Sequence, residues 1–157
     1  MNEIIAQQQR SYFNTNVTKD LSFRKKQLEK LLLILRQNED KLCQAIYEDF
    51  KKSEFDTYAT ELSLVYSEIE AAIKNLKKWS KKRRVRTNVI NMPGRSYSIP
   101  EPLGVSLIIG AWNYPYYLTI GPAIPAIAAG NTVVLKPSEL SKKTSAILAE
   151  IINANFD

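Results

Sequence analysis

The most restrictive feature of this sequence is the placement of its helix breakers, because all five Gly and all seven Pro lie at position 93 or later. A run of 92 residues without either residue type favours helix throughout. The remainder, which holds every Gly and Pro, favours short strands and turns. The chain therefore divides into a helical first part and a second part of mixed α/β structure.

Apolar spacing and capping residues predict three helices in the first part. Thr18 or Asp20 can cap the first helix, and Asn38 can cap the second. A Ser-x-x-Asp pattern that starts at position 53 resembles a capping box for the third, with Asp in place of Glu or Gln. The third helix has the longest apolar stripe, which consists of Tyr58, Leu62, Val65, Ile69, Ala72, Leu76 and Trp79. We expect a helical hairpin or small bundle over residues 1–84.

Residues 85–102, VRTNVINMPGRSYSIPEP, contain a Pro93-Gly94 pair between two short β-prone runs. Pro-Gly is a turn signal, so we expect a β-hairpin or an extended ribbon. The outer edges of this ribbon have no obvious partner within the chain, and a two-stranded ribbon alone is only marginally stable. Pairing with a second subunit would supply the missing partner, which predicts a homo-oligomer joined through residues 85–102.

The third segment, residues 103–157, begins inside a run from Glu101 to Lys136 that has no charged residue between its ends. A membrane span needs about 20 uninterrupted apolar residues, whereas Gly, Pro and Asn break this run into short pieces, so we expect no span. The pattern instead predicts strand, helix, strand and helix over residues 105–110, 117–129, 131–136 and 141–154. Gly130 is placed to end the first of these helices.

Apolar strands that alternate with helices are typical of a parallel sheet buried on both faces, with a right-handed crossover. Two strands are too few, because a doubly wound sheet usually has about four to six, and a complete one needs about 100 further residues. An unfinished sheet exposes apolar surface, which predicts association or aggregation.

Three polar residues follow the two predicted strands, at the end of a parallel sheet where ligands bind. Asn113, in the apolar stretch GAWNYP, is either a structural amide that closes the turn or a donor to an oxyanion on a carbonyl carbon. Lys136 and Glu139 are either a surface ion pair or a pair that binds ribose hydroxyls. The sequence has no G-x-G-x-x-G motif, so the usual pyrophosphate-binding turn is missing.

Composition excludes several other kinds of site. The chain has no His, which excludes Ser-His-Asp triads, Cys-His pairs and histidine metal sites, and we expect no metal site. We interpret the single cysteine, Cys43, as a buried structural thiol in a reducing, cytoplasmic protein. Residues 74–86 hold eight basic and no acidic residues. Such a run can bind nucleic acid, but a solvated helix face is the better interpretation, so we expect no nucleic-acid partner.

Two stretches, EPLGVSLIIGAWNYP (101–115) and GPAIPAIAAGNTVVLKPSE (121–139), together resemble the N-terminal part of an NAD(P)-dependent aldehyde dehydrogenase. Tyr114 and the short N-terminal helical segment are most similar to the class 3, fatty-aldehyde-type branch. The resemblance implies an atypical Rossmann sheet, of which residues 103–157 are the first two βα units. It also implies that the ribbon joins subunits and that the catalytic domain is absent from these residues.

The resemblance implies roles for individual residues. Asn113 matches the amide of the oxyanion hole, and Lys136 and Glu139 match residues that bind the adenosine ribose of NAD or NADP. Five further positions match residues that line the cofactor cleft, namely Ile109, Gly110, Ala111, Trp112 and Pro137. The implied reaction oxidises an aldehyde to a carboxylic acid through a cysteine thioester, which a glutamate-activated water hydrolyses.

Neither the nucleophilic cysteine nor the general-base glutamate of that family has a matching position in this sequence. Cys43 does not match the nucleophile. We therefore expect the isolated chain to be inactive. The alternative is a non-catalytic chain that associates with full-length subunits through its ribbon and its open sheet edge.

Overall fold

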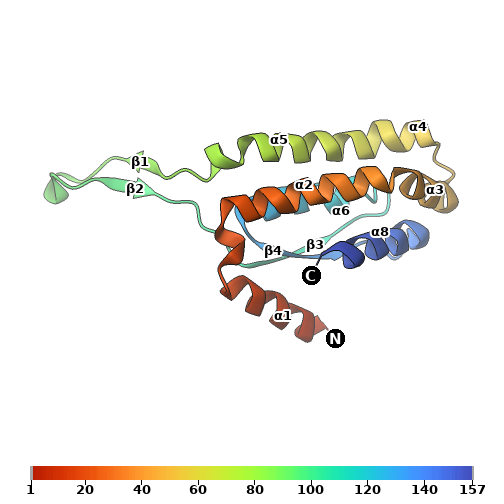
Figure 1. The fold of residues 1–157 in the computed structure, drawn as a ribbon, viewed down its shortest axis with the longest axis horizontal. Helices are drawn as coiled ribbons and strands as arrows, with labels where there is room; N and C mark the ends of the chain where they lie inside the picture. The colour runs from red at the N-terminus through yellow and green to blue at the C-terminus, as the bar shows by residue number, and fades with distance from the viewer. Residues whose placement is uncertain (1, 157) are drawn as a thin grey trace.

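Helices fill the first part of the chain, in agreement with the distribution of Gly and Pro. The computed structural model describes residues 2–156. The helices of the first part are α1 (Asn2–Asn14), α2 (Leu21–Gln37), α3 (Glu39–Phe50), α4 (Glu54–Thr57) and α5 (Ser63–Trp79). Helices α2 and α5 run side by side (Figure 1). Helix α1 precedes every predicted capping residue and adds to the three predicted helices.

Two of the predicted caps form as expected, and the third residue acts differently. Asp20 Oδ1 accepts a hydrogen bond from the backbone N–H of Phe23 at 2.8 Å, and Ser53 Oγ accepts one from Asp56 at 3.1 Å. Asn38 precedes α3, but its side chain donates to the carbonyl of Ile34 at 2.8 Å. The side chain of Asn38 therefore supplies a hydrogen-bond donor to a carbonyl at the C-terminal end of α2, where the last carbonyls have no partner within the helix.

The predicted third helix is interrupted by one π-helical turn. Helix α4 leads into this turn at Tyr58–Leu62, and α5 follows it without a break in the chain direction. A π turn holds one more residue than an α turn, so it changes which side chains face inward. Two residues of this turn, Glu61 and Leu62, are fully buried.

The predicted hairpin is present and projects away from the helices (Figure 1). Strand β1 (Arg83–Val85) pairs antiparallel with β2 (Ser96–Ser98), with Arg84 opposite Tyr97. The ribbon begins two residues earlier than expected, because the basic run does not remain helical beyond Trp79. The side chains at its tip are exposed, including Val89 and Ile90.

The second part contains the predicted parallel pair of strands. Strand β3 (Val105–Ile109) pairs with β4 (Thr132–Lys136) so that Ile109 lies opposite Lys136. The single helix expected between them is divided at Gly121-Pro122 into α6 (Tyr117–Ile120) and α7 (Ala123–Ala129). Gly130 ends α7 with a φ of 96°, in the left-handed region that favours glycine. Helix α8 (Lys142–Asn155) follows β4.

The apolar strands are typical of a sheet that is buried on both faces when complete, and the two-stranded sheet of the described residues exposes apolar side chains, as expected for an unfinished sheet. Successive residues of a strand point to opposite faces. Ile108 is buried, whereas Leu107 and Ile109 are 63% and 67% exposed. Helices α7 and α1 contact β4, and Thr132, on the same face as Leu107, is buried and donates its hydroxyl to the carbonyl of Gln9 in α1 at 3.4 Å. Within residues 2–156, the part of this face that carries Leu107 and Ile109 remains largely exposed. Helix α1 was not predicted from local sequence signals, and it packs against β3 and β4.

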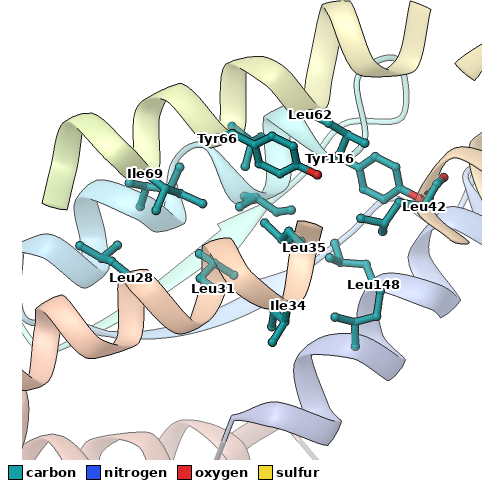
Figure 2. Close-up of a cluster of buried hydrophobic side chains, with 14 of the residues drawn as sticks. Leu28, Leu31, Ile34, Leu35, Leu42, Leu62, Tyr66, Ile69, Tyr116 and Leu148 are labelled. Atoms are coloured by element: carbon teal, nitrogen blue, oxygen red, sulfur yellow. Dashed lines mark hydrogen bonds between the residues drawn. The ribbon is translucent and has the colours of Figure 1, made fainter. Parts of the chain in front are cut away.

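The core lies among α2, α3 and α5 of the first part and α6, α7 and α8 of the second part, and part of it is shown in Figure 2. It includes Leu28, Leu31, Ile34, Leu35, Leu42, Leu62, Tyr66, Ile69, Tyr116 and Leu148. Tyr116 is fully buried and donates its hydroxyl to the carbonyl of Leu42 at 2.8 Å. Burial raises the pKa of Tyr116 well above its ordinary value. This side chain links the helical first part to the segment that follows β3.

Candidate functional site

The carboxyl ends of β3 and β4 lie at one edge of the sheet, and the predicted site residues follow them directly. Ile109 lies opposite Lys136 in the parallel register. The backbone N–H of Gly110 also donates to the carbonyl of Lys136 at 3.0 Å. The structure therefore brings the loop that carries Asn113 and the segment 136–139 together at the edge where parallel sheets bind ligands.

Gly110 makes the close packing of this edge possible. A Cβ atom built on Gly110 would overlap the hydroxyl of Thr119 and lie 3.0 Å from its Cβ. Thr119 is fully buried and belongs to α6. A side chain at position 110 would therefore push α6 away from β3 and displace the loop between them.

Asn113 lies on the surface of that loop. Its side chain is exposed, and within residues 2–156 it has no hydrogen-bond partner, which leaves the amide N–H₂ able to donate to a ligand. Its two neighbours are held by the helical part. The ring of Trp112 lies 6.1 Å from that of Phe50, and Lys52 Nζ lies 4.8 Å from the centroid of Tyr114. Both aromatic rings remain about half exposed.

Lys136 and Glu139 form an exposed ion pair. Lys136 Nζ lies 2.8 Å from Glu139 Oε2, and this hydrogen bond lowers the pKa of the Glu139 carboxyl below its ordinary value. The ammonium group can donate hydrogen bonds and the carboxylate can accept them, which is the combination that a ribose diol needs. Water reaches both groups, so a ligand can replace the contact between them.

The other predicted cleft residues lie along the same edge with different exposure. Ile109, Ala111 and Trp112 are exposed, Pro137 is partly buried and Gly110 is buried. The first three present apolar surface beside the polar groups. The edge thus offers an apolar strip, one free amide and one ion pair, without a glycine-rich turn.

Glu61, which was not predicted as a site residue, lies behind this edge. Glu61 is fully buried, and its Oε1 accepts a hydrogen bond from Lys52 Nζ at 2.7 Å. Its Oε2 accepts from the backbone N–H groups of Tyr116 at 2.9 Å and Tyr117 at 3.3 Å. The sequence does hold a signal for burial, because Glu61 lies three residues after Tyr58 and four before Val65, on the same helix face as these two residues of the apolar stripe.

Cys43 is not placed to act as a nucleophile. The thiol is buried in α3, and burial, with the nearby carboxylates of Glu39, Glu54 and Asp40, raises its pKa to about 11. A thiol with such a pKa is protonated near neutral pH and therefore unreactive. Among residues 2–156, no three His, Cys, Asp or Glu side chains are grouped so that they could hold a metal ion. None of the helices in that range has the length and apolar character that a membrane crossing requires.

Comparison with protein families gives one match over nearly the whole chain. The model described as "Aldehyde dehydrogenase family" matches residues 3–156. The 4,4'-diaponeurosporen-aldehyde dehydrogenase of Staphylococcus aureus is 43% identical over 94% of this chain. Aldehyde dehydrogenase family 3 member A2 of Pongo abelii is 43% identical over 99% of it. The chain spans 32% of the length of each of these curated relatives.

Solved structures that superpose on the chain are also aldehyde dehydrogenases. Staphylococcus aureus AldH, solved in a substrate-bound state, superposes on the whole chain with a TM-score of 0.97 and 41% sequence identity, over 34% of its own length. Succinic semialdehyde dehydrogenase from Streptococcus pyogenes, solved with NADP+ as the cofactor, covers 98% of the chain with a TM-score of 0.83 and 21% identity. At that identity, the second likeness concerns the fold alone.

Proposed function

The chain belongs to the aldehyde dehydrogenase family, and we propose that it supplies the oxyanion donor and part of the cofactor site of an enzyme that oxidises an aldehyde to a carboxylic acid. The observation that carries this proposal is the convergence of Asn113 with Lys136 and Glu139 beyond the carboxyl ends of β3 and β4. Two strands that are distant in sequence supply these groups to one edge.

The proposed role of Asn113 is to donate a hydrogen bond to the oxygen of the reacting carbonyl. Negative charge develops on this oxygen when a nucleophile attacks, and a neutral amide donor stabilises it without being protonated or deprotonated itself. Loss of such a donor lowers kcat by about 10²–10³. The exposed and unpaired N–H₂ of Asn113 fits this role, because no partner within residues 2–156 competes for it.

The residues at this edge also fit a nicotinamide dinucleotide. Lys136 and Glu139 would bind the ribose hydroxyls, and the apolar strip of Ile109, Ala111 and Trp112 would lie against the nucleotide. Gly110 and Pro137 would keep the backbone close to β4. The family uses NAD or NADP, which accepts the hydride when bound. We propose that β3 and β4 are the first strands of an atypical Rossmann sheet within residues 103–157.

Two further assignments belong to this proposal. The ribbon has exposed apolar side chains, and its outer strand edges have no pairing partner within residues 2–156, which supports a homo-oligomer contact through residues 85–102. The helical segment 1–84 then serves as the support for both the ribbon and the site. A single buried thiol suits a reducing compartment, and we propose a cytoplasmic location.

The test is a chimera in which this chain replaces the matching third of Staphylococcus aureus AldH. We expect the chimera to oxidise aldehydes with NAD or NADP. We also expect Glu139→Gln to raise the KM for the dinucleotide while leaving kcat close to that of the unmutated chimera. A folded chimera without turnover would contradict the proposed function. The 157 residues alone are expected to show no turnover, because their only thiol, Cys43, is buried and protonated.

A second candidate function is suggested by the uncovered apolar face of the sheet. Leu107 and Ile109 are largely exposed, as are the edges of the ribbon, so the chain could associate with longer subunits without itself taking part in catalysis. Sedimentation of the chain with and without AldH separates the two. A complex that leaves AldH activity unchanged would favour this alternative, and independent sedimentation would remove it.

A further inference from the structure

Glu61 is a charged residue without access to water. Its side chain has 0% exposure, and both of its oxygen atoms are occupied by partners within the protein. Burying a carboxylate is unfavourable unless it is paired, and an apolar side chain of similar size often serves stability equally well. A carboxylate at this position therefore calls for an explanation beyond the stability of the core.

Its partners lie at the start of the helix that follows the Asn113 loop. The first N–H groups of a helix have no acceptor within that helix. Tyr116 and Tyr117 occupy this position in α6, and both backbone N–H groups donate to Glu61 Oε2, at 2.9 and 3.3 Å. They follow Asn113 by three and four residues. Glu61 thus holds the far end of the loop that carries the amide.

The other oxygen of Glu61 reaches the same loop by a second route. Oε1 accepts from Lys52 Nζ, and that ammonium group also lies 4.8 Å from the centroid of the Tyr114 ring. Tyr114 is the residue next to Asn113. One carboxylate is therefore connected to the backbone after Asn113 and, through Lys52, to its neighbouring side chain.

Glu61 comes from an irregular turn of the long helix rather than from a regular α-helical turn. Glu61 lies in the π turn Tyr58–Leu62 between α4 and α5, the segment that runs along the top of the molecule in Figure 1. Single π turns inside α-helices occur frequently at functional sites. Within this turn, Glu61 and Leu62 are both fully buried.

We propose that Glu61 is a positioning residue that sets the direction of the Asn113 amide, through the backbone N–H groups of Tyr116 and Tyr117 and through Lys52. The inference rests on the proposed function of Asn113. A donor to an oxyanion acts only when it points at the developing charge, and a displacement of about 1 Å can lower the rate by about 10²-fold. Glu61 itself does not touch the reacting atoms.

The test compares two Glu→Gln variants of α5 and its π turn in the AldH chimera. Glu61→Gln keeps the shape of the side chain and weakens the contacts to the loop. Glu68→Gln is the matched control, because within residues 2–156 Glu68 accepts only from the side-chain hydroxyl of Tyr117, at 2.8 Å. We expect Glu61→Gln to lower kcat by about 10- to 100-fold with KM values changed less than about threefold, and Glu68→Gln to leave kcat within about twofold.

Amide hydrogen exchange of the full 157-residue chain provides a readout that does not depend on activity. We expect faster exchange at Tyr116 and Tyr117 in Glu61→Gln, and no change in Glu68→Gln. If Glu61→Gln does not fold, Glu61→Asp keeps the charge but shortens the side chain by one methylene group, and the same pattern is expected.

Three results would overturn the positioning role. They are an unchanged kcat in Glu61→Gln, a loss that only follows a lower melting temperature, and an equal loss in Glu68→Gln. If the unmutated chimera is folded but inactive, the proposed function fails instead. Unchanged exchange at Tyr116 and Tyr117 in Glu61→Gln would then overturn this inference separately, and faster exchange would support it.

Discussion

Two Lys–Glu ion pairs in this structure have nearly the same geometry and opposite surroundings. Lys52 Nζ lies 2.7 Å from Glu61, and Lys136 Nζ lies 2.8 Å from Glu139. The Glu61 side chain is fully buried, whereas that of Glu139 is 78% exposed. The first pair lies behind the Asn113 loop, and the second lies at the open edge of the sheet.

The difference indicates what each pair can do. A buried carboxylate has lost its water and depends on every remaining partner, so removal of one partner is costly. An exposed pair is screened by water and contributes little to stability, so a ligand can take over its hydrogen bonds. We therefore assign the buried pair to the support of the site and the exposed pair to ligand binding.

The largest effect on stability is expected when the buried pair is broken. Lys52→Met leaves the carboxylate of Glu61 without its counter-ion and should destabilise the fold by roughly 3–5 kcal/mol. Urea unfolding of the chain measures this loss. Lys136→Met is the matched control at the exposed pair and should leave the unfolding midpoint unchanged. Equal effects of the two substitutions would remove the distinction between the pairs.

A second substitution tests the close packing of the backbone of Gly110 against Thr119 at the same edge of the sheet. Gly110→Ala places a methyl group against Thr119, and such overpacking should cost about 1–3 kcal/mol. Thr119→Ala removes the hydroxyl that the methyl group meets. The double variant should therefore be less destabilised than the sum of the single variants, as a double-mutant cycle in urea would measure. Strict additivity would contradict the predicted clash.

A smaller and pH-dependent effect is expected at Asp49, which joins α3 to the start of α8. Burial raises the pKa of Asp49, but hydrogen bonds from the backbone N–H groups of Thr144 and Lys143 and from the Thr144 hydroxyl outweigh it, so the pKa lies below its ordinary value. The stabilisation is thus complete above the ordinary pKa of about 3.8 and is lost as the pH falls through the lower folded value.

Asp49→Asn should therefore lower the free energy of unfolding by about 1 kcal/mol near neutral pH, because the charge at the N-terminus of α8 is lost. The difference between Asp49→Asn and the unmutated chain should shrink as the pH falls below about 4. Urea unfolding at several pH values measures both quantities. A difference that stays constant down to about pH 2 would contradict the assigned cause.

The smallest effect concerns the exposed pair. The hydrogen bond from Lys136 lowers the pKa of Glu139, so Lys136→Met should raise that pKa toward its ordinary value without changing the fold. The carboxyl ¹³C shift of Glu139 can be followed by NMR titration. An unchanged pKa would mean that the pair does not form in solution.

Features with local causes were predictable from the sequence. Asp20 and Ser53 cap helices with their own side chains, and Gly130 takes a left-handed backbone conformation that few other residues adopt. The two parallel strands begin and end within one residue of the predicted bounds. Because parallel strands present their carboxyl ends at one edge, the proximity of the Asn113 loop to Lys136 was also predictable.

Features with long-range causes were not predictable in the same way. Helix α1 depends on contacts with β3 and β4, and the role of Glu61 depends on backbone groups 55 and 56 residues away. The division between α6 and α7 had a local signal in Gly121-Pro122, which the prediction of one helix over residues 117–129 did not use. The exposure of Leu107 and Ile109 depends on which elements are packed against the sheet.

The central claim is that Asn113 is the donor to the developing oxyanion, and its removal from the AldH chimera tests this most directly. Asn113→Ala should lower kcat by about 10²–10³ with little change in KM for the aldehyde or the dinucleotide. Asn153→Ala, at an exposed position of α8, is the matched control and should keep full activity. A kcat for Asn113→Ala that equals that of the control would contradict the account.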